Sequence, residues 1–167
     1  NYSKYGLLED DLDQIIVANE GPVDLGSMVP QYSVFNSIRV NQPSGGPVVL
    51  SGDGADECFL GYNRAKEYDS RYSDIFSELI YYHLPRLDKL SMFHTLELRS
   101  PFLSFDVIRI ALGTDYEKSI NKQMLRDIFQ DIVPKPIIDR PKVALRYKSP
   151  RDSDWRYKLI KMHQGLG

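Results

Sequence analysis

The chain carries Val48-Val-Leu-Ser-Gly-Asp-Gly-Ala-Asp-Glu57, in which an apolar triplet leads directly into glycines and carboxylates. The triplet has no alternation of polar and apolar residues, so it predicts a strand that is buried on both faces, as in a parallel sheet. Ligands of open α/β sheets bind at the carboxyl ends of the strands. We therefore expect an α/β fold with a functional site at residues 51–57.

The residues that follow the triplet have the properties of a ligand-binding turn. Gly52 and Gly54 let the backbone approach a ligand closely or adopt positive φ. Asp53 and Asp56 are three positions apart and can share one helical face, where one metal ion could bridge them. An equally weighted interpretation is structural: Ser51 or Asp53 caps the following helix, and the acids complement its positive end.

Most of the remaining chain has helical periodicity. Each apolar stripe predicts a helix face that belongs to the core. The stripes cover residues 8–16, 34–38, 75–80, 87–93, 105–112, 124–132 and 155–162. Proline sets several boundaries, with a start after Pro30 and stops before Pro85 and Pro134. The pattern predicts one strand among six or seven helices.

The clearest break is the Gly- and Pro-rich loop at residues 42–47, because both residue types oppose regular structure. We expect one partial domain over residues 1–167, with helices at 1–41, the strand and acidic site loop at 48–62, a helical part at 63–134, a basic loop at 135–151 and a terminal helix at 152–167. A lone buried strand needs hydrogen-bond partners on both sides. The chain also begins at Asn1 without an initiator Met, so we expect that it is a fragment whose missing strands come from elsewhere.

Composition excludes several classes of protein. The 167 residues include 21 Lys and Arg against 23 Asp and Glu, a net charge of −2 that gives no global field for a polyanion. Cys58 is the single cysteine, which excludes an internal disulfide and thiolate-rich metal sites and favours a reducing compartment. No apolar run approaches the roughly 18 residues of a membrane span. We expect a soluble, cytoplasmic protein that binds neither nucleic acid nor membrane.

Two basic segments are further candidates for the site. Arg99 and Lys89 could hold a phosphate or a carboxylate, although exposed salt bridges on helix surfaces are far commoner than binding sites. Lys142 closes Asp139-Arg-Pro-Lys142 in a basic loop. A lysine there suits a leaving phosphate on which negative charge develops, and the alternative is a loop that only aids solubility.

Taken in order, these segments resemble the synthetase domain of the glutamine-dependent asparagine synthetases. Residues 48–62 are similar to the family motif Val-Val-Leu-Ser-Gly-Asp/Glu-Gly-x-Asp-Glu-x-Phe-Gly-Gly-Tyr, and residues 84–103 match the next motif almost position by position. Lys122-Gln-Met-Leu-Arg126 and residues 133–142 are similar to the later elements Lys-x-x-Leu-Arg and Leu-Pro-x-x-Ile-x-x-Arg-Pro-Lys. The resemblance extends from about Asp10 to about Pro150.

The resemblance implies the C-terminal, mostly α-helical part of a doubly wound parallel-sheet ATP-pyrophosphatase domain. Its members use ATP and Mg²⁺ to adenylate the side chain of aspartate, release pyrophosphate and let ammonia open the acyl-adenylate. By position, Ser51, Gly52 and Gly54 would line the nucleotide and acyl-adenylate pocket. Asp53 would be the acid/base near the ammonia, and Asp56 would hold magnesium and pyrophosphate.

The resemblance also assigns the cations. Lys142 would stabilise pyrophosphate and the developing charge, with Lys89 and Arg99 as supporting cations of the same pocket.

Departures from the family pattern shape the remaining expectations. The chain lacks the family's phosphate loop, Ser-Gly-Gly-x-Asp-Ser, and its glutaminase part with a terminal cysteine. Leu60 stands where the family has glycine, and Ala144-Leu145 replace a Gly-Phe or similar pair. We expect this chain alone to be inactive, to require a chain or segment with the phosphate loop, and to receive ammonia directly or from glutamine through a separate glutaminase. The alternatives are a non-catalytic remnant or regulatory binding subunit, or a relative that amidates another carboxylate.

Overall fold

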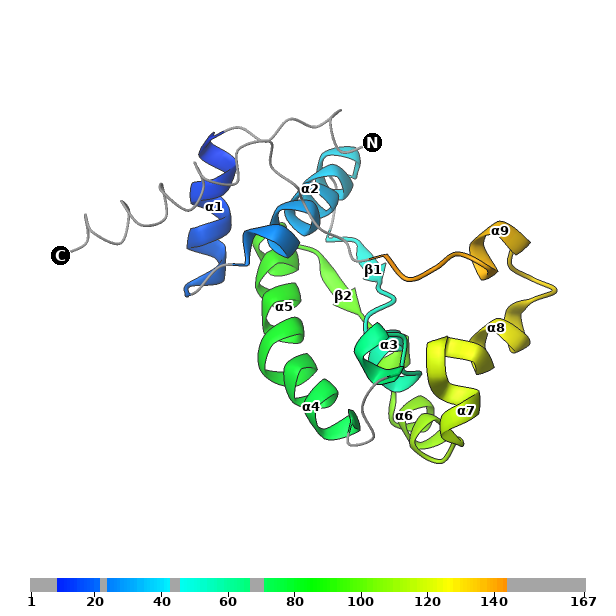
Figure 1. Ribbon diagram of the computed structural model, residues 1–167. Coiled ribbons are helices and arrows are strands. Elements are labelled where there is room, and N and C mark those ends of the chain that lie inside the picture. Colours follow the sequence, from blue (N-terminus) through cyan, green and yellow to red (C-terminus); the bar gives the residue numbers. More distant parts are fainter. Residues whose placement is uncertain (1–8, 22–23, 43–45, 67–70, 144–167) are drawn as a thin grey trace.

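The computed structural model describes residues 9–21, 24–42, 46–66 and 71–143, and Figure 1 shows their arrangement. The helices are α1 (Glu9–Asn19), α2 (Leu25–Asn41), α3 (Ala55–Cys58), α4 (Arg71–Glu78), α5 (Leu84–Phe93), α6 (Phe105–Leu112), α7 (Tyr116–Ser119), α8 (Gln123–Phe129) and α9 (Lys135–Ile138). The strands are β1 (Val48–Leu50) and β2 (Glu97–Arg99). The described part of the chain is thus mostly helical with a small parallel sheet, which is compatible with the α/β class.

The strand at Val48–Leu50 is confirmed, but the prediction that it has no partner within this chain is wrong. β1 pairs in parallel with β2, with Val49 opposite Leu98. The ladder continues past the strands, where the Ser51 N–H donates to the Arg99 carbonyl at 2.8 Å. β2 was missed because its three residues lie between two helical stripes, in a part of the chain predicted to be helical, and only the tertiary pairing defines the strand.

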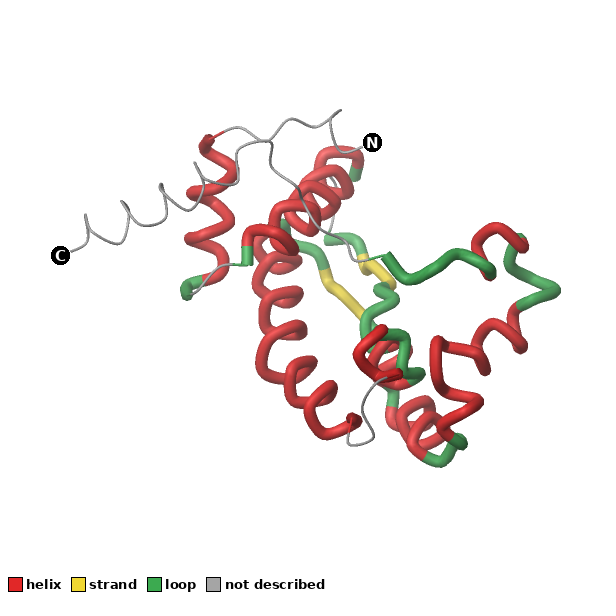
Figure 2. Tube along the Cα trace, in the orientation of Figure 1, coloured by secondary structure: helices red, strands yellow, loops and turns green. Residues whose placement is uncertain are grey.

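The two faces of the sheet have different environments. Val49 and Leu98 pack on the helices, whereas Val48 and Leu50 are 49% and 71% exposed. The prediction that β1 is buried on both faces is therefore wrong for the described residues. In Figure 2 the strands lie between the long helices and the group of short helices, and helix packing covers one face of the sheet.

The larger core lies between α1, α2, α5 and the sheet. The amphipathic pattern of α1 places Leu12 and Ile15 in this core, as the spacing predicted. Its buried members are Leu12, Ile15, Met28, Val29, Tyr32, Phe35, Leu87, Leu90 and Leu96. This packing holds the sheet, and with it the carboxyl end of β1, against three helices.

The smaller core surrounds α3. Cys58 and Phe59 are buried against Ala111 of α6, with apolar side chains from α4 and α8 packed at the periphery. An adjacent cluster of Leu60, Ala65 and Ile75 continues it. The short helix after the strand is therefore anchored on several sides, and its first turn is held in a defined position.

Two predicted helix boundaries at proline are wrong. α2 begins at Leu25, so the buried Pro30 lies inside the helix and does not precede it. The predicted stop before Pro85 is replaced by a π-helical turn, Leu79–His83, that joins α4 to α5. In this turn the Leu84 N–H donates to the Leu79 carbonyl, five residues back. The wider π-helical turn makes room for the ring of Pro85, which would clash with the backbone inside a regular α-helix.

The C-terminal stripe differs from the prediction as well. α6 matches its predicted span, but α8 ends at Phe129, and Ile128 and Ile132 are 54% and 76% exposed, so this stripe is not wholly core. The predicted basic loop begins with the short helix α9. The predicted last helix at residues 155–162 lies outside the described residues.

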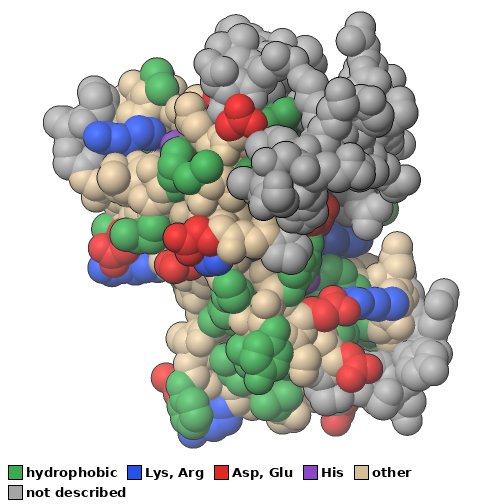
Figure 3. All heavy atoms as spheres, turned by 90° about the vertical axis from the view of Figure 1, so that its left-hand side faces the viewer, with side chains coloured by type: hydrophobic (Ala, Val, Ile, Leu, Met, Phe, Trp, Pro, Cys, Tyr) green, Lys and Arg blue, Asp and Glu red, His purple; other side chains and the backbone are tan. Residues whose placement is uncertain are grey.

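The surface on the side of α1 and α5 is mixed in character. Figure 3 shows acidic and basic side chains next to one another on this face, with apolar groups between them. Among the described helices, none has both the length and the apolar character needed to cross a bilayer.

Candidate functional site

The turn after β1 is built from two hydrogen bonds and one special glycine. Ser51 Oγ donates to Asp53 Oδ2 and accepts from the Asp53 N–H at 3.2 Å. Gly54 has φ +93°, and a Cβ there would lie 2.7 Å from Leu103 Cγ. This conformation and the close packing both require glycine.

The capping interpretation of this turn is wrong. Gly54 occupies the N-cap of α3, and no side chain of the described residues caps it. Ser51 and Asp53 bond to each other instead, which leaves Gly52 in open space. Asp56 and Glu57 do lie in the first turn of α3, where negative charge is favourable.

Asp56 is the centre of the charged cluster. Its Oδ2 accepts a hydrogen bond from Lys142 Nζ at 2.5 Å, and its Oδ1 lies 2.7 Å from Lys122 Nζ. The carboxylate is only 18% exposed. Burial alone would raise its pKa, but the hydrogen bonds and charges of the two lysines outweigh that effect and hold the pKa of Asp56 below its ordinary value.

Lys142 reaches the cluster from the segment after α9. Its ammonium group lies 5.5 Å from the centroid of the Tyr62 ring, within the range of a cation–π contact. Tyr62 is fixed in turn, since its hydroxyl donates to Glu57 Oε1 at 2.6 Å. The contact with Asp56 places Lys142 next to residues 51–57, although its role toward pyrophosphate stays a prediction.

Lys122 is the member of the cluster that sequence reasoning did not assign. Asn121 and Lys122 both have φ +58°, and their N–H groups donate to the carbonyls of Leu60 and Phe59 at 3.0 Å. These two hydrogen bonds join Asn121 and Lys122, just before α8, to the residues that follow α3. Lys122 opens the Lys-x-x-Leu-Arg element quoted above, which was the signal available in the sequence.

Gly61 provides the space for this contact. A Cβ at this position would lie 2.8 Å from Lys122 Cε and would also meet Asp56 Oδ1. Leu60, the departure from a family glycine, has φ +44° and is buried. A glycine adopts this left-handed conformation without strain, so the structure gives a physical reason for the family residue.

The two other predicted cations lie apart from Asp56. Lys89 Nζ donates to the Asn19 carbonyl at 2.6 Å and so binds the end of α1. Arg99 Nε donates to Glu97 Oε1 at 2.7 Å on the exposed face of the sheet. Only the main chain of Arg99 reaches the site turn, through Ser51. Their role as supporting cations stays a prediction.

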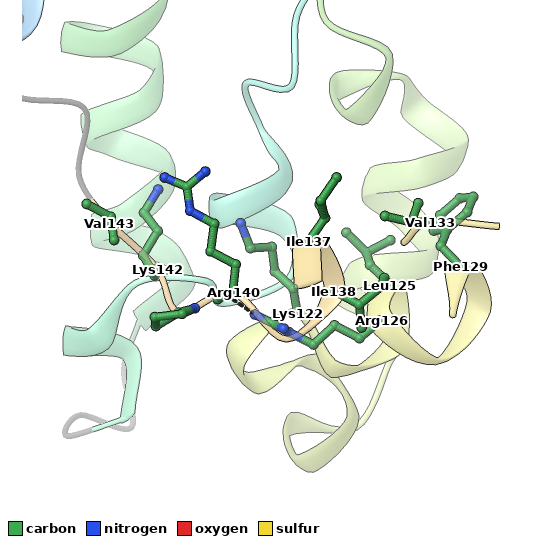
Figure 4. Close-up of a pocket in the computed structure, with 11 residues that line it drawn as sticks. Lys122, Leu125, Arg126, Phe129, Val133, Ile137, Ile138, Arg140, Lys142 and Val143 are labelled. Atoms are coloured by element: carbon green, nitrogen blue, oxygen red, sulfur yellow. Dashed lines mark hydrogen bonds between the residues drawn. The ribbon is translucent and has the colours of Figure 1, made fainter. Parts of the chain in front are cut away.

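A pocket of about 410 Å³ opens beside the cluster. Figure 4 shows Lys122, Arg140 and Lys142 extending in the same direction from its rim, with Phe129 and Val133 at the opposite end. Arg126 is fixed by donating to the carbonyls of Asn121 and Arg140. The pocket thus combines a cationic side with an apolar one.

The Asp56 carboxylate, which the resemblance assigns to magnesium, is already paired with two lysines. Both Asp56 oxygens face ammonium groups, so a divalent cation at this carboxylate would have to displace one of them. No group of three or more His, Cys, Asp or Glu among the described residues is placed to hold a metal. Magnesium is commonly bound by one or two carboxylates together with waters and substrate phosphates, so it does not require such a group. The role of Asp56 as a metal ligand stays a prediction.

The arrangement suits the binding of an anion. Two ammonium groups and one carboxylate leave a net positive charge at a partly buried position next to the turn after β1. Lysines arranged in this way stabilise phosphate groups as point charges.

Comparisons with known proteins agree with the motifs. The family model "Asparagine synthase" matches residues 3–80 and 70–165. The asparagine synthetases [glutamine-hydrolyzing] of Bos taurus and Mus musculus are each 32% identical over 151 residues, which is 80% of this chain and 26% of those proteins. A probable asparagine synthetase of Acanthamoeba polyphaga mimivirus is 28% identical over 150 residues, or 82% of this chain and 27% of that protein. The chain thus spans about a quarter of the length of these relatives.

Proposed function

The chain belongs to the asparagine synthase family, and on that premise we propose that it is part of an ATP-dependent, amide-forming synthetase. The proposed substrate is a carboxylate, with aspartate the first to test because the relatives are asparagine synthetases. The observation that carries the proposal is the contact of Lys142 with Asp56, which joins two family motifs 86 residues apart in one cluster.

The proposed reaction has two steps. An oxygen of the substrate carboxylate bonds to the α-phosphorus of ATP, the bond to the bridging oxygen breaks, and pyrophosphate leaves with the electron pair. Ammonia then attacks the carbonyl carbon of the acyl-adenylate, loses a proton and expels AMP. Adenylation turns the carboxylate oxygen into part of a good leaving group.

This chain would supply electrostatic stabilisation and proton transfer. Lys142 would neutralise the charge that grows on pyrophosphate, which its ammonium group can do as a point charge. Asp53, half-buried in the turn after β1, would accept the proton of the ammonia. Gly52 stands in open space, so a nucleotide phosphate can approach the backbone there.

The rest of the active site would come from another segment. We propose that β1 belongs to the doubly wound parallel sheet of an ATP-pyrophosphatase domain, in which further strands extend the sheet at its edges and their helices cover the face that carries Val48 and Leu50. That segment would bring the phosphate loop, and ammonia would come from solution or from glutamine through a glutaminase part. The exposed apolar residues on β1 support this proposal, because apolar strand faces are normally covered.

The experiment is a pyrophosphate-release assay on a protein that carries this chain together with the phosphate-loop segment. ATP, Mg²⁺, ammonium and aspartate are supplied, and glutamate replaces aspartate in a parallel series. We expect Lys142→Ala to lower kcat about 10²-fold and Lys142→Arg to restore it only in part, since the wider, planar guanidinium misplaces the charge.

Lys118→Ala is the matched control, because Lys118 is exposed and, within the described residues, pairs with Asp115, which directly precedes α7. Equal rates for the wild type and Lys142→Ala would remove Lys142 from the mechanism. Absence of pyrophosphate release from the wild type would favour the non-catalytic or regulatory alternative, and faster turnover of glutamate would favour the alternative that another carboxylate is amidated.

A further inference from the structure

Lys122 and Lys142 hold the same carboxylate but are themselves held differently. Lys122 is fixed through its backbone, because its own N–H and that of Asn121 donate to carbonyls at the end of α3. Lys142 lies in residues 139–143, after α9, where the structure has no helix or strand. The backbone of Lys122 is therefore hydrogen-bonded to the residues after α3, whereas Lys142 belongs to a segment of irregular backbone.

The absence of a side chain at Gly61 leaves room for Lys122 to reach Asp56. Lys122 passes so close to Gly61 that a Cβ would lie 2.8 Å from its Cε. Lys122 reaches Oδ1 of Asp56 from this side, while Lys142 reaches Oδ2. Each carboxylate oxygen thus has its own cation, and the two cations come from different segments of the chain.

We infer that Lys122 is a positioning residue of the proposed synthetase, which holds Asp56 through Oδ1 and leaves Lys142 available to the anionic product. When Lys142 turns toward a phosphate group, Asp56 keeps a charged partner, so a partly buried carboxylate is not left unpaired. Without Lys122, Asp56 holds Lys142 with both oxygens and competes with the anion for it. This inference rests on the proposed function and adds a role for a residue outside residues 51–57 and 139–142.

The first test is kinetic and uses the same pyrophosphate-release assay. Lys122→Met should lower kcat about 10-fold while KM for ATP changes by less than about 2-fold. Lys122→Arg keeps the charge and should recover part of the loss. Gly61→Ala should act in the same direction as Lys122→Met although both charges remain, because the added methyl group separates Lys122 from Asp56.

The matched controls are Lys118→Met and Gly21→Ala. Lys118 is an exposed lysine away from Asp56, and a Cβ at Gly21 meets no atom closer than 3.9 Å. Both should keep the wild-type kcat. A Lys122→Met protein with wild-type kcat, or one in which KM alone rises, would overturn the inference.

The second test needs no turnover. In urea unfolding, Lys122→Met, Asp56→Asn and the double variant form a cycle, and a direct pair predicts a non-additive effect of about 5-fold in the ratio of folded to unfolded protein. Additive effects would overturn the inference. If the wild-type protein releases no pyrophosphate, the proposed function fails, and the cycle still decides whether Lys122 holds Asp56.

Discussion

Replacing Gly54 by alanine tests the geometry of the turn that begins the site. The residue has φ +93°, a left-handed conformation that costs an L-residue about 1–2 kcal/mol. The new Cβ would lie 2.7 Å from Leu103 Cγ and 3.4 Å from Phe102 Cβ, and overpacking of this kind costs about 1–3 kcal/mol. The two effects together predict a loss of about 2–5 kcal/mol in the free energy of unfolding.

The assay is urea unfolding followed by circular dichroism, with Gly52→Ala as the control because a Cβ there meets no atom within 4 Å. Gly52→Ala should stay within about 0.5 kcal/mol of the wild type. The double variant Gly54→Ala/Leu103→Ala should lose less than the sum of the single losses, because the smaller side chain removes the clash. A Gly54→Ala protein as stable as the wild type, or strictly additive losses, would refute this account of the turn.

Three other measurements test the charged and buried groups. Because the pKa of Asp56 is lowered in the folded chain, the ionised carboxylate stabilises the fold above the unfolded pKa near 3.8, and this stability is lost as the pH falls through the folded pKa. In urea unfolding, Asp56→Asn should therefore be less stable than the wild type at pH 7, and the difference in free energy of unfolding should disappear below about pH 4. Burial lowers the pKa of His94, so the unfolded chain binds its proton first, and stability should fall as the pH drops below about 6.5, less so in His94→Gln. Burial raises the pKa of the Cys58 thiol to about 11, so the thiol should react with a disulfide reagent at pH 8 only after urea is added.

Local sequence was sufficient for elements whose residues interact mainly with close neighbours. The periodicity of α6 and α1 located both helices, and the triplet at Val48–Leu50 located β1 together with the turn that follows it. β2 was not predictable in this way, because Glu97-Leu-Arg99 has one apolar residue between two charged ones, unlike the apolar triplet of β1, and forms a strand through its pairing with β1. The burial of β1 was overestimated as well, because an apolar triplet does not show whether the described helices cover one face of the strand or both.

The site was predictable only in part. The resemblance identified Asp56 and Lys142 as members of one site, and the structure brings them together. The resemblance also suggested Lys89, but this residue lies on α5 and donates to the Asn19 carbonyl at the end of α1, because α1 packs on α5. Lys122 could not be found from spacing, because its position depends on two left-handed residues whose N–H groups bond to the end of α3.

The separation of 86 residues between Asp56 and Lys142 has a consequence for the order in which the protein forms. At synthesis rates of about 5–20 residues per second, Lys142 leaves the ribosome about 4–17 s after Asp56. The nascent chain can pair β1 with β2 and pack α3 on α6 before this lysine exists. The contact of Lys142 with Asp56 therefore forms on residues that were synthesised before this lysine, and Lys122, which is made 20 residues earlier, can pair with Asp56 first.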